Sequence, residues 1–272
     1  PGMATRVRVA VLGVGSLGRQ HARIYGEMHR QGTVELVGVY DTDPAQAKSI
    51  AEKHGTTALG SVEDAAAAAD VLSIVTPTVT HHALAKPLLE QGKHLLVEKP
   101  MTDNAGQAAD LVRLARQHDC VLQVGHIERF NPVFNYLQKA AREPRFIESH
   151  RLSPFPARSM DIGVVLDLMI HDLDILQQII GEEPVQIEAV GVAVRTTEID
   201  FANARLTFPG GCVATLTAIR VSRIARRELR FFQSNGCFSI DLLAQSASIV
   251  HLEPHEANGD AAEVRRERLD VD

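Results

Sequence analysis

Short apolar runs alternate with amphipathic stretches along the first half of the chain. Five runs have the length and β-branched content of buried strands, and the stretches between them have helical periodicity. The predicted strands cover residues 7–12, 34–40, 71–75, 94–97 and 121–124, and the predicted helices about 16–31, 44–54, 61–69, 79–91 and 104–118. Strands that alternate with helices indicate βαβ units. We therefore expect an α/β fold with an N-terminal Rossmann domain, a doubly wound parallel sheet.

The pattern changes near Gly125. Helices are predicted at 131–142 and 162–180 and strands at 145–151, 185–195, 201–208, 212–220, 228–233, 237–242 and 246–252. Glycine-bearing turns at 209–211 and 234–236 are typical of hairpins. We expect a C-terminal α+β domain with a largely antiparallel open sheet. The first domain is placed at residues 3–124 and the second at 125–272, with Pro1 and Gly2 resembling a tag remnant.

Composition narrows the function classes. The chain has 272 residues, 45% of them apolar, and a formal net charge of -6 with acidic and basic residues interspersed. This balance argues against nucleic acid or an anionic membrane surface as the partner. The lack of a long apolar run and of an export signal predicts a cytoplasmic protein. Three cysteines without C-x-x-C spacing indicate reduced thiols and no metal site.

Three glycines follow the first predicted strand in the stretch Gly13-Val-Gly15-Ser16-Leu17-Gly18. The first allows a tight turn, the second lets backbone N–H groups approach a pyrophosphate, and the third lets helix and strand pack closely. Asp41 ends the second strand, where a carboxylate accepts hydrogen bonds from a ribose and repels a 2'-phosphate. The pattern predicts NAD rather than NADP, although Asp41 also suits a simple turn.

Two further polar stretches end strands at the same predicted sheet edge, where open α/β sheets bind ligands. One contains Thr76, Pro77, Thr78 and His81, and the other is Glu98-Lys99-Pro100. The threonines also suit a helix cap, and a lysine is usually solvated. However, the following proline favours an extended backbone at Lys99, and a lysine beside a nicotinamide can hydrogen-bond a reacting hydroxyl.

Asp167 and His171 lie four residues apart in an apolar predicted helix. They share a face, so the carboxylate can orient the imidazole and raise its basicity. A buried structural ion pair, or a pair with a metal, is the alternative. His126, Arg129 and Asn131 lie at the predicted domain junction, with binding and purely structural roles both open.

Together, these motifs resemble the Gfo/Idh/MocA family of nicotinamide-dependent sugar and cyclitol oxidoreductases. The resemblance implies that Lys99, Asp167 and His171 form the catalytic group, with His171 as the base while hydride passes to the nicotinamide. It also implies that the cofactor is held by Gly13, Gly15, Ser16, Leu17, Gly18, Asp41, Thr76, Pro77, Thr78, His81, Glu98 and Lys99. Members usually close with a helix that returns to the nucleotide domain, and the charged stretch 255–270 predicts none, which suggests a truncated C-terminus.

Within the family, residues 125–132, 161–174 and 200–205 are similar to enzymes that oxidise the 3-hydroxyl of UDP-N-acetylglucosamine, for example toward a diamino sugar in lipid A. The substrate-binding set implied is Lys99, His126, Arg129, Asn131, Arg158 and His171. Arg151, Arg158, Arg220 and Arg223 would help neutralise a diphosphate, unless they are surface or interface charges. Alternatives are a dehydrogenase of a free sugar or a cyclitol such as myo-inositol, and a non-catalytic NAD(H)-sensing module. The open sheet predicts a homodimer or homotetramer.

Overall fold

The computed structural model describes residues 6–155, 162–253 and 263–270. The chain divides into two compact units, residues 1–125 and 126–272, and each is described by itself. In the described residues, no helix is long and apolar enough to cross a membrane. All three cysteines are free thiols, with Cys212 buried and the other two half-buried.

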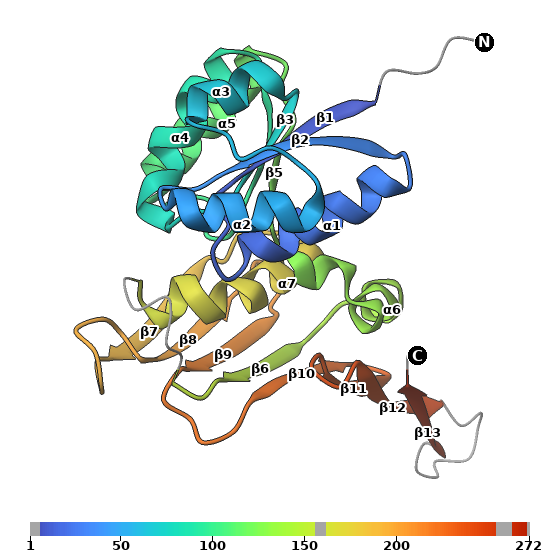
Figure 1. Ribbon diagram of the computed structural model, residues 1–272. Helices are drawn as coiled ribbons and strands as arrows, with labels where there is room; N and C mark the ends of the chain where they lie inside the picture. The colour runs from blue at the N-terminus through green and yellow to red at the C-terminus, as the bar shows by residue number, and fades with distance from the viewer. Residues whose placement is uncertain (1–5, 156–161, 254–262, 271–272) are drawn as a thin grey trace. The chain divides into compact units, whose positions relative to one another are not determined.

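The first unit is built on a parallel sheet with the strand order β2-β1-β3-β4-β5 (Figure 1). Every neighbouring pair in it is parallel, which confirms the predicted doubly wound sheet. The strands are β1 (Val7–Leu12), β2 (Val34–Tyr40), β3 (Val71–Ile74), β4 (His94–Val97) and β5 (Leu122–Val124).

Helices cover both faces of this sheet. They are α1 (Gly18–Arg30), α2 (Pro44–His54), α3 (Val62–Ala68), α4 (Thr78–Glu90) and α5 (Ala105–Gln117). Successive residues of β1 point to opposite faces, so Leu12 belongs to a core with α3, α4 and α5, whereas Val11 packs with residues of α1 and α2. Figure 1 shows α1 and α2 together on one face and the other three helices on the opposite face.

Local sequence signals set the starts of several helices. The side chain of Asp43 accepts hydrogen bonds from the N–H groups of Ala45 and Gln46, and Pro44 occupies the first turn of α2. Ser61 caps α3 in the same way, and Asn104 caps α5. Each cap satisfies N–H groups that have no partner inside the helix. These caps fix where the helices begin, and therefore the lengths of the loops at the sheet edge.

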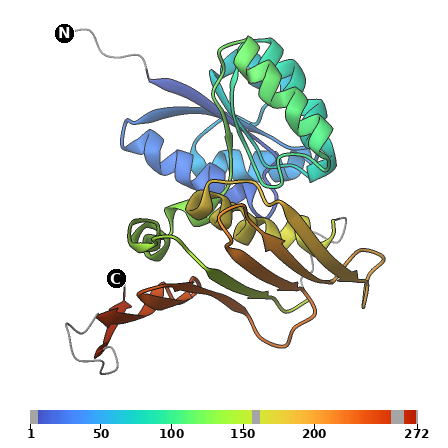
Figure 2. The same ribbon diagram turned by 180° about the vertical axis from the view of Figure 1, so that it is seen from behind.

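The second unit contains an eight-stranded sheet with the order β13-β12-β11-β10-β6-β9-β8-β7 (Figure 2). Among the described strands of this sheet, only β6 and β9 pair in parallel, so the predicted antiparallel character is confirmed. The strands are β6 (Phe146–Leu152), β7 (Gln186–Val192), β8 (Phe201–Thr207), β9 (Val213–Ile219), β10 (Arg226–Gln233), β11 (Gly236–Asp241), β12 (Ser246–Glu253) and β13 (Glu263–Asp270).

The core of this unit lies between one sheet face and the helical segments. These are the 3₁₀ helix η1 (Ile127–Phe130), α6 (Pro132–Ala140), the π-helix η2 (Val165–Met169) and α7 (Ile170–Ile180). Phe134 of α6, Met169 of η2 and Ile175 of α7 join Phe231 and Leu216 of the sheet in one buried cluster. Alternate residues of β6 and β9 are buried, as expected when one face of a sheet meets a core.

Two segments of the second unit differ from the prediction. Residues 165–169 form a π-helix where an α-helix was expected, and such turns occur frequently at functional sites. No strand was predicted in the charged C-terminal stretch, but Glu263–Asp270 forms an edge strand paired with β12. Charged side chains suit an exposed sheet edge, and they also conceal the strand from an apolar-pattern search.

Candidate active site

The glycine turn between β1 and α1 has the geometry of a phosphate cradle. Gly13 has φ +84°, and a Cβ there would lie 2.6 Å from the carbonyl oxygen of Val75. A Cβ on Gly18 would lie 1.8 Å from the carbonyl oxygen of Gly13. By contrast, a Cβ on Gly15 would meet nothing within 4 Å. Gly13 and Gly18 are therefore required by packing, whereas Gly15 leaves open space above the turn.

The helix that follows the turn presents an open N-terminus. Leu17 occupies the N-cap position of α1 without a side-chain cap, and Ser16 and Leu17 are exposed. Backbone N–H groups and the positive end of the helix dipole favour an anionic group at such a terminus. Together with the space above Gly15, this fits the pyrophosphate of a dinucleotide.

Asp41 lies directly against the glycine turn. Its Oδ2 accepts hydrogen bonds from the N–H of Val14 at 2.8 Å and from the side-chain amide of Gln46 at 3.0 Å, and its Oδ1 accepts one from the N–H of Asp43 at 2.9 Å. A carboxylate has about four acceptor positions, so these three bonds still leave capacity for a ribose hydroxyl. The turn role of Asp41 and its proposed ribose contact are therefore compatible.

Gly15 faces open space and Gly18 is packed against backbone, so alanine substitutions at these two positions provide a matched test of the phosphate cradle. We expect Gly15→Ala to fold normally but to raise the Kd for NADH at least about tenfold, because its methyl group occupies space needed by the phosphates. Gly18→Ala is expected to lose more than about 4 kcal/mol of stability, because its Cβ overlaps backbone. Thermal unfolding and NADH fluorescence titration measure both effects. Normal NADH affinity in a folded Gly15→Ala protein would contradict the proposed phosphate position.

Asp41 should also set the choice of dinucleotide. Because like charges in contact cost several kcal/mol, we expect NADH to bind at least about 100-fold more tightly than NADPH. Asp41→Asn keeps an acceptor for Val14 but removes the charge, so it should reduce this ratio. Parallel titrations with the two cofactors measure it, and tighter binding of NADPH to the unaltered protein would overturn the assignment.

The loops after β3 and β4 are tied together by His81. Its imidazole is 1% exposed, with Nε2 2.8 Å from the carbonyl oxygen of Thr76 and Nδ1 3.0 Å from that of Pro100. The hydroxyl of Thr76 contacts that of Thr80 at 2.7 Å, Thr78 is buried at the start of α4, and Pro77 is exposed. His81 thus connects the two loops, and its direct contact with a cofactor stays a prediction.

Glu98, Lys99 and Pro100 follow β4 at the same edge. Lys99 is half-buried, and the Lys99–Pro100 peptide bond is cis. The carboxylate of Glu98 is buried: its Oε2 accepts a hydrogen bond from the N–H of Lys99 at 3.1 Å, and its Oε1 lies 3.0 Å from His21 Nε2. Glu98 therefore contacts groups inside the unit, which gives it a supporting role beside its predicted cofactor contact.

In the second unit, Asp167 and His171 lie on either side of a change in helix type. Asp167 belongs to the π-helix η2 and His171 to the first turn of α7, and both are half-buried. The backbone N–H of Asp167 donates to the carbonyl of Gly163 at 3.1 Å. Their pairing, predicted from α-helical spacing, stays a prediction, because a π turn changes the angle between residues four apart.

A buried ionic cluster holds α7 against β6 and η1. Arg151, 3% exposed, donates to the carboxylate of Asp172 at 2.7 and 3.0 Å and to Glu128 at 3.1 Å. Although burial opposes its charge, these two carboxylates raise the pKa of Arg151. Arg129 donates to Asp174 at 2.9 Å, and Nδ1 of His126 lies 3.9 Å from the same carboxylate. His126 and Arg129 therefore surround one acidic residue of α7.

A second buried pair fixes the segment before Asp167. Arg220, 1% exposed, donates to Asp200 at 2.7 Å and to the carbonyl of Ile162 at 2.6 Å. Asp200 also accepts hydrogen bonds from the N–H groups of 194–196. Burial favours the neutral acid, but these donors and Arg220 hold the pKa of Asp200 well below its ordinary value.

These clusters correct part of the sequence interpretation. Arg151 and Arg220 were candidates to neutralise a substrate diphosphate, but both are buried and bound to carboxylates of their own unit. The side chain of Asn131 caps α6 by accepting from Val133 N–H, and it donates to Glu128 and to the carbonyl of Leu242. We therefore leave Asn131 out of the proposed substrate set. Arg158 lies outside the described residues.

Sequence reasoning missed several polar residues that the structure brings together. Asp172, Asp174 and Glu128 were given no role because their partners come from other elements. For Asp172 and Asp174, their position as carboxylates within an apolar helix was a signal that could have found them. His21 was another missed residue. It follows Gly18 by three positions, a spacing that carried no assigned role.

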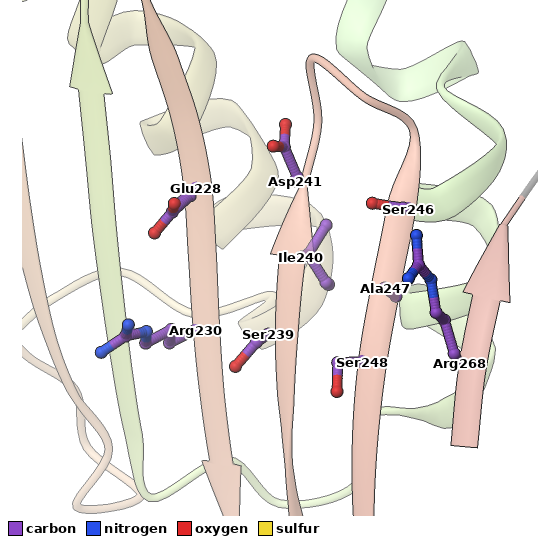
Figure 3. Close-up of a pocket in the computed structure, with 9 residues that line it drawn as sticks. All are labelled: Glu228, Arg230, Ser239, Ile240, Asp241, Ser246, Ala247, Ser248 and Arg268. Atoms are coloured by element: carbon purple, nitrogen blue, oxygen red, sulfur yellow. The ribbon is translucent and has the colours of Figure 1, made fainter. Parts of the chain in front are cut away.

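None of the predicted site residues lines the open hollow on the second unit's sheet. This hollow has a volume of about 370 Å³ and lies over β10–β13, where Glu228, Arg230, Asp241 and Arg268 are interspersed with three serines (Figure 3). Its open, polar character differs from a typical small-molecule site, which is concave and mostly apolar. We therefore treat it as part of the sheet surface.

Comparison with known proteins decides the family. Residues 7–126 match the Gfo/Idh/MocA oxidoreductase family with an NAD-binding Rossmann fold, and residues 140–239 match the Gfo/Idh/MocA C-terminal domain. The chain belongs to the Gfo/Idh/MocA family. This confirms the resemblance drawn from the sequence motifs and identifies the first unit as an NAD-binding Rossmann domain.

Individual members of the family show different degrees of similarity. UDP-N-acetylglucosamine 3-dehydrogenase of Acidithiobacillus ferrooxidans is 42% identical over 246 residues, which are 90% of this chain and 77% of that protein. A solved structure of that enzyme covers 98% of this chain and 84% of its own, with 40% identity and a TM-score of 0.89. Inositol 2-dehydrogenase of Rhizobium meliloti is 30% identical over 69% of this chain and 59% of its own length.

Proposed function

We propose that this protein oxidises the 3-hydroxyl of UDP-N-acetylglucosamine with NAD, giving the 3-keto sugar nucleotide and NADH. The observation that carries the proposal is the 42% identity to an enzyme of that name over 90% of the chain. The sequence supports the proposal, because it contains the catalytic group that the family motifs imply, Lys99, Asp167 and His171.

The proposed chemistry divides between the two units of the chain. Bound NAD supplies the hydride acceptor. Lys99 donates a hydrogen bond to the reacting oxygen and stabilises the charge that develops there. An imidazole nitrogen of His171 takes the hydroxyl proton, and Asp167 orients the ring and stabilises its protonated form. In the reverse direction the same groups return the protons.

For the diphosphate, the structure leaves fewer candidates than the sequence did. Arg223 is exposed in the loop between β9 and β10, and it keeps its proposed role. Arg129 and His126 stay in the proposed substrate set, because Arg129 is partly exposed beside Asp174. A guanidinium is suited to this role because its fork of N–H groups matches phosphate oxygens.

The proposal is tested by incubating the protein and NAD with a panel of UDP-sugars, free sugars and cyclitols while recording NADH absorbance. We expect UDP-N-acetylglucosamine to give the highest kcat/KM. A higher kcat/KM for myo-inositol or a free sugar would favour the alternative dehydrogenase. If the protein binds NAD but no compound in the panel leads to its reduction to NADH, the result would favour an NAD(H)-sensing module.

The assembly is also a proposal: a homodimer or homotetramer formed through the open face of the second unit's sheet. On β10–β13 this face carries both Glu228 and Asp241 and both Arg230 and Arg268, so it can be complementary to a second copy (Figure 3). Light scattering coupled to sizing should give at least twice the mass of one chain, and a monomer would refute the proposal. A cytoplasmic location and a place in lipid A biosynthesis stay predictions.

A further inference from the structure

His21 is a histidine to which the proposed chemistry assigns no role. It lies on α1, and 14% of its side chain is exposed. Its Nδ1 lies 2.8 Å from the hydroxyl of Ser73 on β3, and its Nε2 lies 3.0 Å from Glu98 Oε1 after β4. One imidazole therefore joins the helix of the glycine turn to two neighbouring strands.

The carboxylate of Glu98 also contacts the next residue, Lys99. Its Oε2 accepts a hydrogen bond from the backbone N–H of Lys99 at 3.1 Å. The backbone of Gly125 closes over the other side, since a Cβ there would lie 2.7 Å from Oε1. The carboxylate has little freedom to move, because the His21 ring, Gly125 and the Lys99 amide enclose it.

Ser73, the residue that contacts Nδ1 of His21, is also buried. It is 0% exposed, and the side chain of Tyr25, one turn further along α1, lies near it. Burial raises the pKa of Tyr25, and the nearby Ser73 hydroxyl acts in the opposite direction. Ser73 thus holds Nδ1 of His21 while Glu98 holds Nε2.

We propose that His21 is a positioning residue for Lys99 that acts through Glu98. The turn that begins α1 is the proposed site of the dinucleotide phosphates, and the contacts from His21 to the Lys99 amide fix the backbone of the proposed reacting lysine relative to that turn. The inference rests on the proposed function to the extent that Lys99 acts on the substrate. Displacement of a reacting group by about 1 Å can cost about 100-fold in rate, so the loss of these contacts is expected to lower turnover.

Three variants test the proposal. His21→Phe keeps a ring but removes both nitrogens, and His21→Gln keeps an N–H donor within reach of Glu98. His82→Phe is the control, since His82 forms a partly exposed pair with Asp110 on α4 and α5. Three properties are measured: backbone hydrogen exchange at Lys99 in the NAD-bound protein, kcat for UDP-N-acetylglucosamine, and the Kd for NADH of the cofactor-free protein.

In His21→Phe we expect the Lys99 amide to exchange about tenfold faster, the effect of losing one charge-assisted hydrogen bond. We expect kcat to fall about 10- to 100-fold, while the Kd for NADH changes less than about threefold. His21→Gln should recover most of both losses, and His82→Phe should show neither. Adding Glu98→Gln to His21→Phe should lower kcat no further than the worse single change, because both act through one contact.

Unchanged exchange at Lys99 in His21→Phe would overturn the proposal. So would faster exchange throughout the first unit, α5 included, or equal losses in His21→Gln, since these indicate a general structural role. The exchange measurement requires no sugar substrate. If the unaltered protein fails to oxidise UDP-N-acetylglucosamine, the proposed function is wrong, and exchange at Lys99 still decides the role of His21.

Discussion

Replacing Lys99 by methionine, or His171 by alanine, is expected to lower kcat about 10²- to 10⁴-fold, the range that a positioned proton-transfer or hydrogen-bonding group contributes. Methionine preserves the length of the lysine side chain while removing its charge and its donors. Alanine removes the proposed base. Because the glycine turn and Asp41 lie elsewhere in the chain, the Kd for NADH should change less than about threefold in either variant.

The measurements are steady-state turnover of UDP-N-acetylglucosamine and fluorescence titration with NADH. Lys86→Met is the matched control, because Lys86 is a half-buried lysine of the same unit that pairs with Asp110 on α5. It should retain normal turnover. Near-normal kcat in Lys99→Met or in His171→Ala would contradict the catalytic role assigned to that residue. A large loss of NADH affinity with little loss of kcat in Lys99→Met would leave Lys99 only its predicted cofactor contact.

The second large effect is expected at Asp200, where Asp200→Asn should lower the free energy of unfolding of the second unit by about 3–5 kcal/mol. Asp200 and Arg220 are 0% and 1% exposed, and removing one charge leaves the other buried and uncompensated. Asp70→Asn is the control, because the Asp70–Arg8 pair is more than 40% exposed and contributes at most about 1 kcal/mol. Urea unfolding followed by circular dichroism measures both.

The effect of Asp200 should depend on pH in a defined direction. The folded-state pKa of Asp200 is held below its ordinary value, so its stabilisation is fully present above the unfolded-state pKa, about 3.9. It is lost as pH falls from there toward the folded-state pKa. The difference in unfolding free energy between the unaltered protein and Asp200→Asn should therefore be constant from pH 5 to 7 and shrink below about pH 4. A constant difference down to pH 3 would contradict this account.

The features that the sequence predicted well depend on short-range chemistry. Gly13, Gly18 and the cap at Asp43 are required by backbone groups within a few residues or in the adjoining strand, and the apolar strands of the first unit leave no alternative to a covered parallel sheet. The candidate residues at the carboxyl edge follow from the same topology, because each comes directly after a strand.

The features that it predicted poorly depend on pairing across elements. Arg151 is 21 residues from Asp172, and Arg220 is 20 residues from Asp200, so each arginine alone suited a phosphate as well as a buried carboxylate. His21 and Glu98 are 77 residues apart, and three strands, β2, β3 and β4, lie between them in the chain. Neither periodicity nor motif spacing contains that information, since it arises only when the sheet is assembled.

The proposed reaction is tested most directly by following the hydrogen that moves. UDP-N-acetylglucosamine carrying deuterium at C3 of the sugar is incubated with the protein and NAD, and the nicotinamide product is analysed by mass spectrometry and NMR. The account predicts NADH with one deuterium at C4 of the nicotinamide and a 3-keto sugar nucleotide in equal amount. Unlabelled NADH, or no reduction of NAD at all, would contradict it.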